Sequence, residues 1–368
     1  MTYSLPRCSL LLALLTLLTV IPSQPIAAQA RDAGARMERV ADGVYAIIHD
    51  AATEDWPNSN TGVVVGDNGV LVVDATYLPS RAKADIALIR TMTDKPVRYV
   101  VISHLHRDHT GGTSAYREAF PNVSVISGPE TREFIAINRA ATARAGAASG
   151  SPLRARLAAL ERQLSAGHDS SGRALSAQET AALAKNVSQR RIEITDLEGY
   201  TVVVPDVTVK TELVLHLGAR TVVIQDRGRA NSPDDVTAFV ADQRVLFTGD
   251  IVVEAPIPYL GATWPVEWAR VLRDIEASAP SAVVPGHGPV MHDVSYVRSM
   301  RELIESVDGQ VAALLKQGLP LDQIQQRVDV ATNRAAVPAW NSADVDADWR
   351  GSVRALVERA WHELRGLD

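Results

Sequence analysis

The sequence of 368 residues contains a single cysteine, Cys8, and this scarcity removes several kinds of chemistry at once. Cys8 lies before the apolar run Leu10–Ile21, whereas a lipid-attachment cysteine would follow such a run, so a lipoprotein is not predicted. Beyond that run the chain can form no disulfide and can offer no thiolate, either as a metal ligand or as a nucleophile.

The N-terminal residues have the pattern of an export signal. Arg7 precedes the apolar run, which is too short to span a bilayer, and Ala28-Gln29-Ala30 follows it as an A-x-A cleavage site. We therefore expect a signal peptide over residues 1–30, with cleavage after Ala30, and a periplasmic or secreted mature protein. An uncleaved anchor is the alternative interpretation of the same run.

Other absences narrow the class of protein further. The formal net charge is −6 and no basic stripe stands out, so we expect no nucleic-acid partner. Beyond residue 30 no apolar run is long enough to cross a membrane, and no stable membrane anchor is expected after signal cleavage. The sequence also has no Gly-x-Ser-x-Gly motif, which disfavours a serine hydrolase of that type. A small-molecule substrate remains the expected partner, and the oligomeric state is not predicted.

What the sequence does contain is a dense cluster of metal-binding side chains, His104-Leu105-His106-Arg107-Asp108-His109. Three of the 9 histidines fall within these six positions. The cluster follows the valine-rich run Arg98–Ile102, a predicted buried strand, and precedes two glycines and a predicted helix over Thr113–Ala119. It therefore occupies a loop at the carboxyl end of a strand, the edge where α/β sheets place their ligands. Imidazole and carboxylate are zinc ligands; the alternative is a chance cluster of surface histidines.

The cluster reads H-x-H-x-D-H, and with later segments it resembles the metallo-β-lactamase-fold metallohydrolases. The resemblance covers about residues 37–292 and implies an α/β, four-layer αβ/βα sandwich with a helical insertion. We expect one domain over residues 31–368, with the insertion at about 130–198 and closing helices over 293–368. The segments that carry the resemblance, in the order of the family, are Gly69-Val70-Leu71-Val72-Val73-Asp74, Gly228-Arg229-Ala230-Asn231-Ser232-Pro233-Asp234-Asp235, Leu246-Phe247-Thr248-Gly249-Asp250 and Val284-Pro285-Gly286-His287-Gly288.

The resemblance implies two metal positions. His104 and His106 would hold the first metal, Asp108, His109 and His287 the second, and Asp250 both. Zinc is the expected cofactor, with one or two ions per chain, and manganese or iron are alternatives. Asp108 would also orient a metal-activated water and take its proton, as the catalytic residue.

Two further positions bear on this site. Asp74, at the end of the predicted strand Val70–Val73, would support the metal loop from behind the ligands, or else cap the next helix. At Asn231 the family normally has a histidine, the third ligand of the first metal, and an asparagine oxygen binds zinc more weakly. His216 is the only spare histidine nearby in sequence, and its place in a predicted strand favours core packing or support over ligation.

The substrate is less well defined by the sequence. Asp250 is typical of thioesterase, lactonase and phosphodiesterase relatives, whereas β-lactamases of this fold usually have Cys or Ser there. Trp56, Tyr259 and Trp264 are candidates for an apolar substrate pocket or for ordinary loop packing. We expect hydrolysis of a small ester, thioester, lactone or lactam. A phosphodiesterase and a non-hydrolytic metal-binding periplasmic accessory protein are the alternatives. The helical insertion at about 130–198 has two interpretations, an outer cover of the fold or a lid over the site.

Overall fold

A computed structural model describes residues 34–49, 58–254, 263–341 and 346–367. The predicted signal peptide, residues 1–30, lies outside this part of the chain. Within the described ranges, none of the helices combines the length and the apolar character needed to span a membrane.

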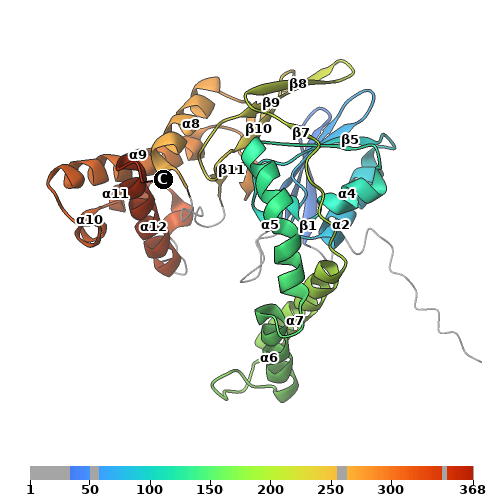
Figure 1. The fold of residues 1–368 in the computed structure, drawn as a ribbon, viewed down its shortest axis with the longest axis horizontal. Helices are drawn as coiled ribbons and strands as arrows, with labels where there is room; N and C mark the ends of the chain where they lie inside the picture. Colours follow the sequence, from blue (N-terminus) through green and yellow to red (C-terminus); the bar gives the residue numbers. More distant parts are fainter. Residues whose placement is uncertain (1–33, 50–57, 255–262, 342–345, 368) are drawn as a thin grey trace, which may run out of the picture.

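The first of two β-sheets has seven strands, which follow one another across the sheet in chain order, β1 to β7 (Figure 1). The strands β1 to β4 pair antiparallel, and β4 to β7 pair parallel. The turn residues Asp42-Gly43 and residues 66–69, each between apolar runs, predict two hairpins, and both are present. The strands are β1 (Ala35–Ala41), β2 (Val44–His49), β3 (Thr61–Val65), β4 (Val70–Val73), β5 (Val97–Val101), β6 (Ser124–Ser127) and β7 (Val207–Thr208).

The second sheet has five strands in the order β12-β11-β10-β9-β8. Its first four strands in sequence form an antiparallel meander, and β12 lies parallel to β11. The register of β11 with β12 shifts on either side of Gly249, next to Asp250. The strands are β8 (Glu212–Leu217), β9 (Arg220–Asp226), β10 (Val236–Val240), β11 (Val245–Val253) and β12 (Ala282–His287).

Three buried apolar clusters show how the layers stack. Leu71 and Val101 of the first sheet pack with Val222 and Phe247 of the second, so one cluster lies between the sheets. A second cluster joins the other face of the first sheet to α2 (Pro79–Met92) and α4 (Thr113–Ala119). Burial of these faces supplies the main stabilising term of the fold.

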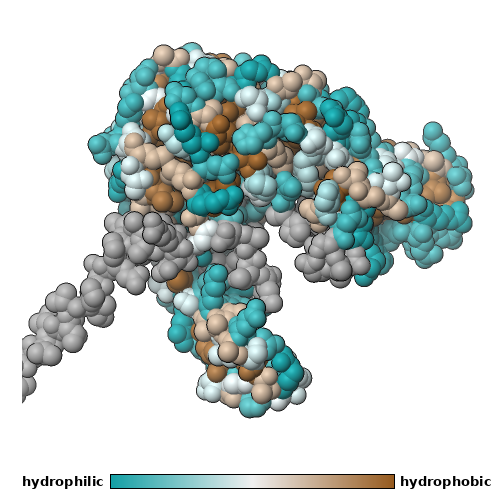
Figure 2. Space-filling model, turned by 180° about the vertical axis from the view of Figure 1, so that it is seen from behind, coloured by the Kyte–Doolittle hydropathy of each residue, from teal (hydrophilic) through white to brown (hydrophobic). Residues whose placement is uncertain are grey.

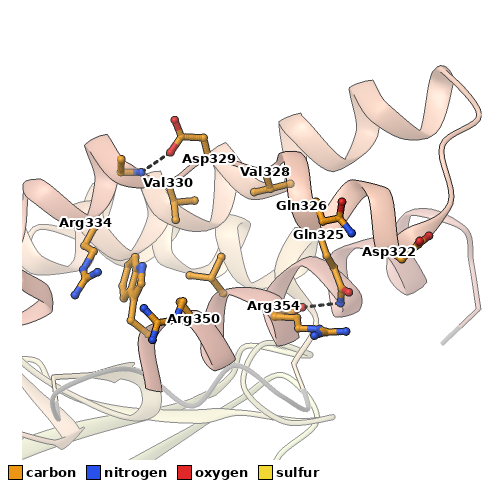
Figure 3. Close-up of a pocket in the computed structure, with 12 residues that line it drawn as sticks. Asp322, Gln325, Gln326, Val328, Asp329, Val330, Arg334, Arg350 and Arg354 are labelled. Atoms are coloured by element: carbon orange, nitrogen blue, oxygen red, sulfur yellow. Dashed lines mark hydrogen bonds between the residues drawn. The ribbon is translucent and has the colours of Figure 1, made fainter. Parts of the chain in front are cut away.

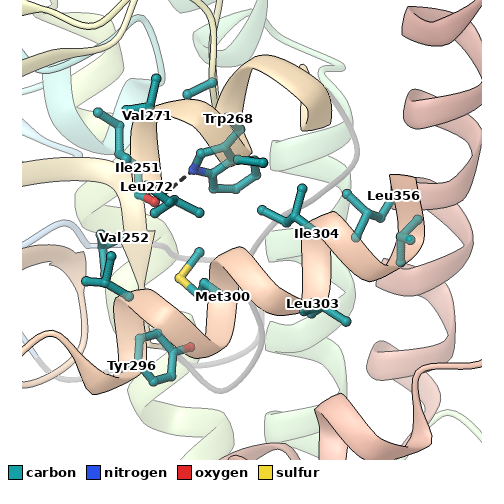
Figure 4. Close-up of a cluster of buried hydrophobic side chains, with 14 of the residues drawn as sticks. Ile251, Val252, Trp268, Val271, Leu272, Tyr296, Met300, Leu303, Ile304 and Leu356 are labelled. Atoms are coloured by element: carbon teal, nitrogen blue, oxygen red, sulfur yellow. Dashed lines mark hydrogen bonds between the residues drawn. The ribbon is translucent and has the colours of Figure 1, made fainter. Parts of the chain in front are cut away.

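The third cluster covers the outer face of the second sheet. Ile251 and Val252 of β11 pack with helices α8 (Pro265–Ser278) and α9 (Ser295–Lys316), and Figure 4 shows the indole N–H of Trp268 donating to the carbonyl oxygen of Ile251, at 3.0 Å. The order helix, sheet, sheet, helix confirms the four-layer architecture. The remaining C-terminal elements are α10 (Leu321–Arg327), α11 (Ala331–Ala335), the 3₁₀ helix η1 (Pro338–Asn341) and α12 (Asp346–Leu364).

The predicted insertion consists of three helices that project from the body as an arm (Figures 1 and 2). They are α5 (Pro129–Ala147), α6 (Pro152–Ala166) and α7 (Ala177–Glu198). The sequence Ser176-Ala177-Gln178-Glu179 predicts a capping box, and this box opens α7, because the side chains of Ser176 and Glu179 each accept a hydrogen bond from the other's backbone N–H. None of the residues of α6 is buried, whereas α5 has buried residues from Thr131 to Ala143 and α7 has them from Val187 to Leu197.

A cavity of 550 Å³ lies among the C-terminal helices, between α10, α11 and α12 (Figure 3). Val330 and Trp349 contribute apolar surface to it, and Arg350 and Arg354 contribute cationic surface. None of its lining residues is a predicted metal ligand, so this cavity is separate from the chemistry expected at the sheet edge.

The structure corrects several details of the expected chain path. The β-branched residues 201–204 predict a strand, but they do not form one; only Val207 and Thr208 pair with β6 at the edge of the first sheet. The run over residues 244–247 predicts a strand that Asp250 follows, whereas β11 runs on through Asp250 to Val253. Three short elements were not predicted: α3 (Arg107–Thr110), α11 and η1.

Candidate metal centre

The strands β5, β11 and β12 bring the predicted ligands to one edge of the sandwich. His104 and His106 follow β5, and Asp108 and His109 lie in the single helical turn α3. Asp250 lies in β11, and His287 is the last residue of β12. Backbone hydrogen bonds tie these positions to neighbouring segments: the N–H of Ala75 donates to the carbonyl oxygen of His109 at 2.8 Å, and the N–H of Glu254 donates to that of His287 at 3.0 Å.

The side chains form two groups whose ligand atoms lie within 4.8 Å of one another. One group is His104, His106 and Asp250, and the other is Asp108, His109, Asp250 and His287. This grouping matches the division into two metal positions implied by the resemblance, with Asp250 common to both. The assignment of each residue as a ligand stays a prediction.

The distances within the second group are short. Asp108 Oδ2 lies 3.0 Å from His287 Nε2 and 3.4 Å from His109 Nε2. Asp250 Oδ1 lies 3.2 Å from His109 Nε2 and 3.4 Å from His287 Nε2. In the first group, His104 Nε2 lies 3.5 Å from Asp250 Oδ2 and 2.8 Å from His106 Nδ1.

The residues fit a divalent cation on a direct test. The buried atoms His109 Nε2 and Asp250 Oδ1 lie 3.2 Å apart, yet neither makes a hydrogen bond of acceptable geometry within the described part of the chain. Buried polar atoms are rarely left in this state, because the loss of water around them costs free energy. Imidazole nitrogen and carboxylate oxygen converging on one point form the donor set of zinc and related ions.

The charges of the buried groups are balanced against one another. Burial, and then His109 and His106, hold the pKa of His104 well below its ordinary value, so this imidazole is neutral, as a metal ligand must be. Burial opposes the charge on His109, but Asp250, Asp74 and Asp108 outweigh it and raise the pKa of His109 well above the usual range.

The pKa values of the two carboxylates, Asp108 and Asp250, are lowered. Burial would raise the pKa of Asp108, yet His109 and His287 lower it well below its ordinary value. Burial likewise opposes ionisation of Asp250, and His109, His287 and His104 together lower its pKa. The carboxylates are therefore ionised, and a cation would replace the proton on His109 as their counter-charge.

Asp74 lies behind the ligands, where the resemblance placed it. Its carboxylate accepts hydrogen bonds from the backbone N–H and the hydroxyl of Ser103, each at 2.8 Å. Asp74 Oδ2 also lies 2.7 Å from His109 Nδ1. This contact leaves Nε2 of His109 for a cation, which is the usual role of a carboxylate behind a histidine ligand.

Two supporting residues were missed in the sequence. Ser103 links Asp74 to the start of the histidine loop, and only its place between strand and motif could have indicated this. Asn60 donates from Nδ2 to the backbone oxygens of Pro285 at 3.0 Å and Gly288 at 2.8 Å, so it clamps both sides of His287. Nothing in the local sequence around Asn60 indicates this long-range contact.

The remaining candidate residues are placed as follows. Asn231 is fully buried in the loop between β9 and β10, and its role as a ligand stays a prediction. Trp264 lies at the start of α8 with the guanidinium groups of Arg229 and Arg359 over its ring, at 5.6 and 5.3 Å.

His216 is exposed on β8 and contacts Thr221, so the expectation of core packing or support is wrong. Trp56 and Tyr259 lie outside the described residues.

Comparison with known proteins agrees with this fold and site. The profile of the metallo-beta-lactamase superfamily matches residues 55–305, and the chain belongs to this superfamily. The linear primary-alkylsulfatase of Pseudomonas sp. (strain ATCC 19151) is 21% identical over 317 residues, which make up 83% of this chain and 55% of the relative. The chain thus spans about half the length of that curated relative.

Solved structures show the same fold. The metallo-beta-lactamase from Pontibacter korlensis has a TM-score of 0.52 at 16% identity, covering 74% of this chain and 99% of its own. A stereoselective inverting sec-alkylsulfatase from Pseudomonas sp. has a TM-score of 0.56 at 17% identity, covering 90% of this chain and 51% of its own. The chain is therefore a metallo-beta-lactamase superfamily protein with a potential divalent-metal site.

Proposed function

We propose that this protein is a metal-dependent hydrolase, with zinc as the first candidate cofactor and manganese or iron as alternatives. The observation that carries the proposal is the pair of ligand groups that share Asp250 at one sheet edge. A divalent cation bound there supplies activation of water near neutral pH and polarises the scissile group of the substrate. The chain's own residues bind the substrate, orient it and transfer protons.

Asp108 is the proposed catalytic residue. Its carboxylate is ionised, lies beside His287 and His109, and is 7% exposed, so one side of it faces the outside of the site. It can orient an attacking water and accept its proton. The contact of Asp74 Oδ2 with His109 Nδ1, at 2.7 Å, orients the His109 ring beside Asp108.

The proposed substrates are small esters, thioesters, lactones or lactams. A second class, sulfate esters of alcohols, is favoured by one observation. The sec-alkylsulfatase structure covers 90% of this chain, whereas the metallo-beta-lactamase structure covers 74%, so the likeness to the former extends further along the chain. This supports a sulfatase assay beside the esterase and lactamase assays.

A substrate panel tests the proposal. The purified chain, loaded in turn with zinc, manganese and iron, is assayed on nitrocefin, an aryl ester, a thioester, a lactone, an alkyl sulfate and an aryl phosphodiester. We expect turnover of at least one ester, lactone, lactam or sulfate, and a loss of at least about 100-fold in Asp108→Asn. Turnover of the phosphodiester alone would support the phosphodiesterase alternative. Metal binding without any turnover would support the accessory protein, and absence of metal binding would contradict both.

We also propose that the protein acts after export, on a small-molecule substrate. The support is the N-terminal sequence pattern alone. N-terminal sequencing of the protein from a periplasmic fraction tests it, with Arg31 expected as the first residue. Recovery of the full-length chain in the membrane fraction would support the uncleaved anchor instead.

A further inference from the structure

The base of the insertion contains buried charged residues, which is an unusual place for them. Arg139 of α5 is 7% exposed, and Arg190 and Glu193 of α7 are 5% and 3% exposed. Burying a charge costs free energy unless the group is paired and hydrogen-bonded. These three residues lie where the arm meets the histidine loop, residues 104–109, and their contacts show what they do there.

The first contact runs from α5 to the loop backbone. Nη2 of Arg139 donates a hydrogen bond to the carbonyl oxygen of Leu105. Leu105 lies between His104 and His106, the two histidines of the first ligand group. The guanidinium also lies over the ring of Phe134, at 5.1 Å, which fixes its position on α5.

The second contact runs from α7 to the side chain of Arg107. Glu193 accepts hydrogen bonds from the hydroxyl of Tyr77 at 2.7 Å and from Arg190 at 3.0 Å. Arg107 donates to the same hydroxyl at 3.1 Å, and its guanidinium lies 4.3 Å from the centre of the Tyr77 ring. Arg107 lies between His106 and Asp108, so α7 holds the next intervening position of the loop.

The two contacts alternate with the ligands along the loop. His104, His106 and Asp108 belong to the ligand groups, whereas Leu105 and Arg107 are held by the insertion. An outer cover would need no buried charge at its base. A lid would need a base that moves independently of the loop, and these contacts connect the two.

We propose that the insertion is a support for the metal site, in which Arg139 and Glu193 are positioning residues that hold the histidine loop in its ligating conformation. The inference rests on the proposed metal-dependent function and extends it to a segment outside the ligand set. Mutation of residues that hold metal ligands in place commonly lowers metal affinity by about 10- to 100-fold.

The test measures zinc affinity by competition with a chelator, together with the visible spectrum of the cobalt-loaded full chain. We expect Arg139→Met and Glu193→Gln to weaken zinc binding by about 10-fold or more and to shift the cobalt bands. Arg139→Lys retains a donor for the Leu105 carbonyl and should recover part of the affinity. Arg191→Met is the matched control, because Arg191 is exposed on α7 and pairs with Glu161 within the arm. It should bind zinc as the unchanged protein does.

The outcomes separate this inference from the proposed function. If the unchanged protein binds zinc and both variants bind it equally well with unaltered cobalt spectra, the supporting role is wrong and the proposed function stands. If the unchanged protein binds no zinc, cobalt, manganese or iron, both fail. Glu193→Gln keeps the shape of the side chain, so a folding defect in Arg139→Met would not decide the result.

Discussion

Gly286 lies so close to Asp250 that a β-carbon on Gly286 would stand 2.0 Å from Asp250 Oδ1. The same β-carbon would meet the backbone of Gly249 and Asp250 at 2.8 and 2.9 Å. The glycine of the Pro-Gly-His segment therefore lets β12 approach the shared carboxylate, and only a residue without a side chain fits there.

This relationship gives the first prediction. Gly286→Ala should displace Asp250 and weaken metal binding by at least about 10-fold, with a fall in the free energy of unfolding of about 1 to 3 kcal/mol from overpacking. Isothermal titration with zinc and urea denaturation measure the two effects. Gly309→Ala is the control, because nothing lies within 4 Å of a β-carbon at that position in α9, and alanine favours a helix. Unchanged zinc affinity in Gly286→Ala would show that the close approach is not needed.

Asp74 supplies the second prediction. Its φ of 64° is a conformation that asparagine tolerates, so Asp74→Asn should fold while losing the charged partner of His109 Nδ1. We expect zinc affinity to fall by about 10- to 100-fold. Chelator competition measures this. Asp67→Asn, which changes a carboxylate bound to the distant backbone N–H of Ala219, should leave the affinity unaltered; equal losses in the two variants would point to a general effect of charge.

The shared carboxylate leads to a prediction of stoichiometry. Asp250→Ala should remove metal from both ligand groups, whereas His106→Ala should remove it only from the first group, because His106 belongs to that group alone. Native mass spectrometry of the zinc-loaded variants counts the ions. His216→Ala, at an exposed position outside both groups, should keep the full complement. Retention of the normal ion count by Asp250→Ala would refute the sharing.

A prediction of pH dependence concerns a carboxyl far from the metal groups. Burial, and then Glu363 and Glu305, raise the pKa of Asp308 in α9 to about 8. The folded protein thus keeps a proton that the unfolded chain releases above its ordinary pKa of about 4. The folded state gains most below that value, and the free energy of unfolding falls as the pH rises towards 8.

Asp308→Asn removes this fall in the free energy of unfolding, because asparagine does not ionise. We expect the variant to be equally stable near pH 4 and more stable than the unchanged protein by up to about 5 kcal/mol at pH 8, because a pKa difference of one corresponds to about 1.4 kcal/mol. Urea denaturation at the two pH values measures the difference. Glu302→Gln, an exposed change on the same helix, should have a similar small effect at both. A gain for Asp308→Asn that is the same at both pH values would contradict the assignment.

Much of the fold follows from local sequence. Alternating apolar residues predicted the hairpin of β1 and β2, and Ser176 with Glu179 predicted the start of α7, because these signals act between neighbours. Residues 201–204 are β-branched and predicted a strand, but strand formation depends on a partner and Pro205 cannot donate a backbone hydrogen bond. Only the two residues of β7 find that partner.

The residues of the site likewise divide into those that the sequence predicted and those that it did not. Close spacing made the loop of His104 to His109 recognisable, and the resemblance supplied Asp250, His287 and Asp74. The contacts of Asn60 with Pro285, and of Arg139 with Leu105, join residues far apart in the chain. One sequence without aligned relatives contains no signal for such pairs, because each partner looks like an ordinary polar residue in its own surroundings.

The position of Asp250 in both ligand groups also determines how ions would load. The second group has two carboxylates, whereas the first has only the one that it shares. An ion entering the second group would neutralise part of that shared charge and repel a second dication nearby. Binding should therefore show negative cooperativity, with the Asp108 group filling first and the histidine pair filling only at higher metal concentration.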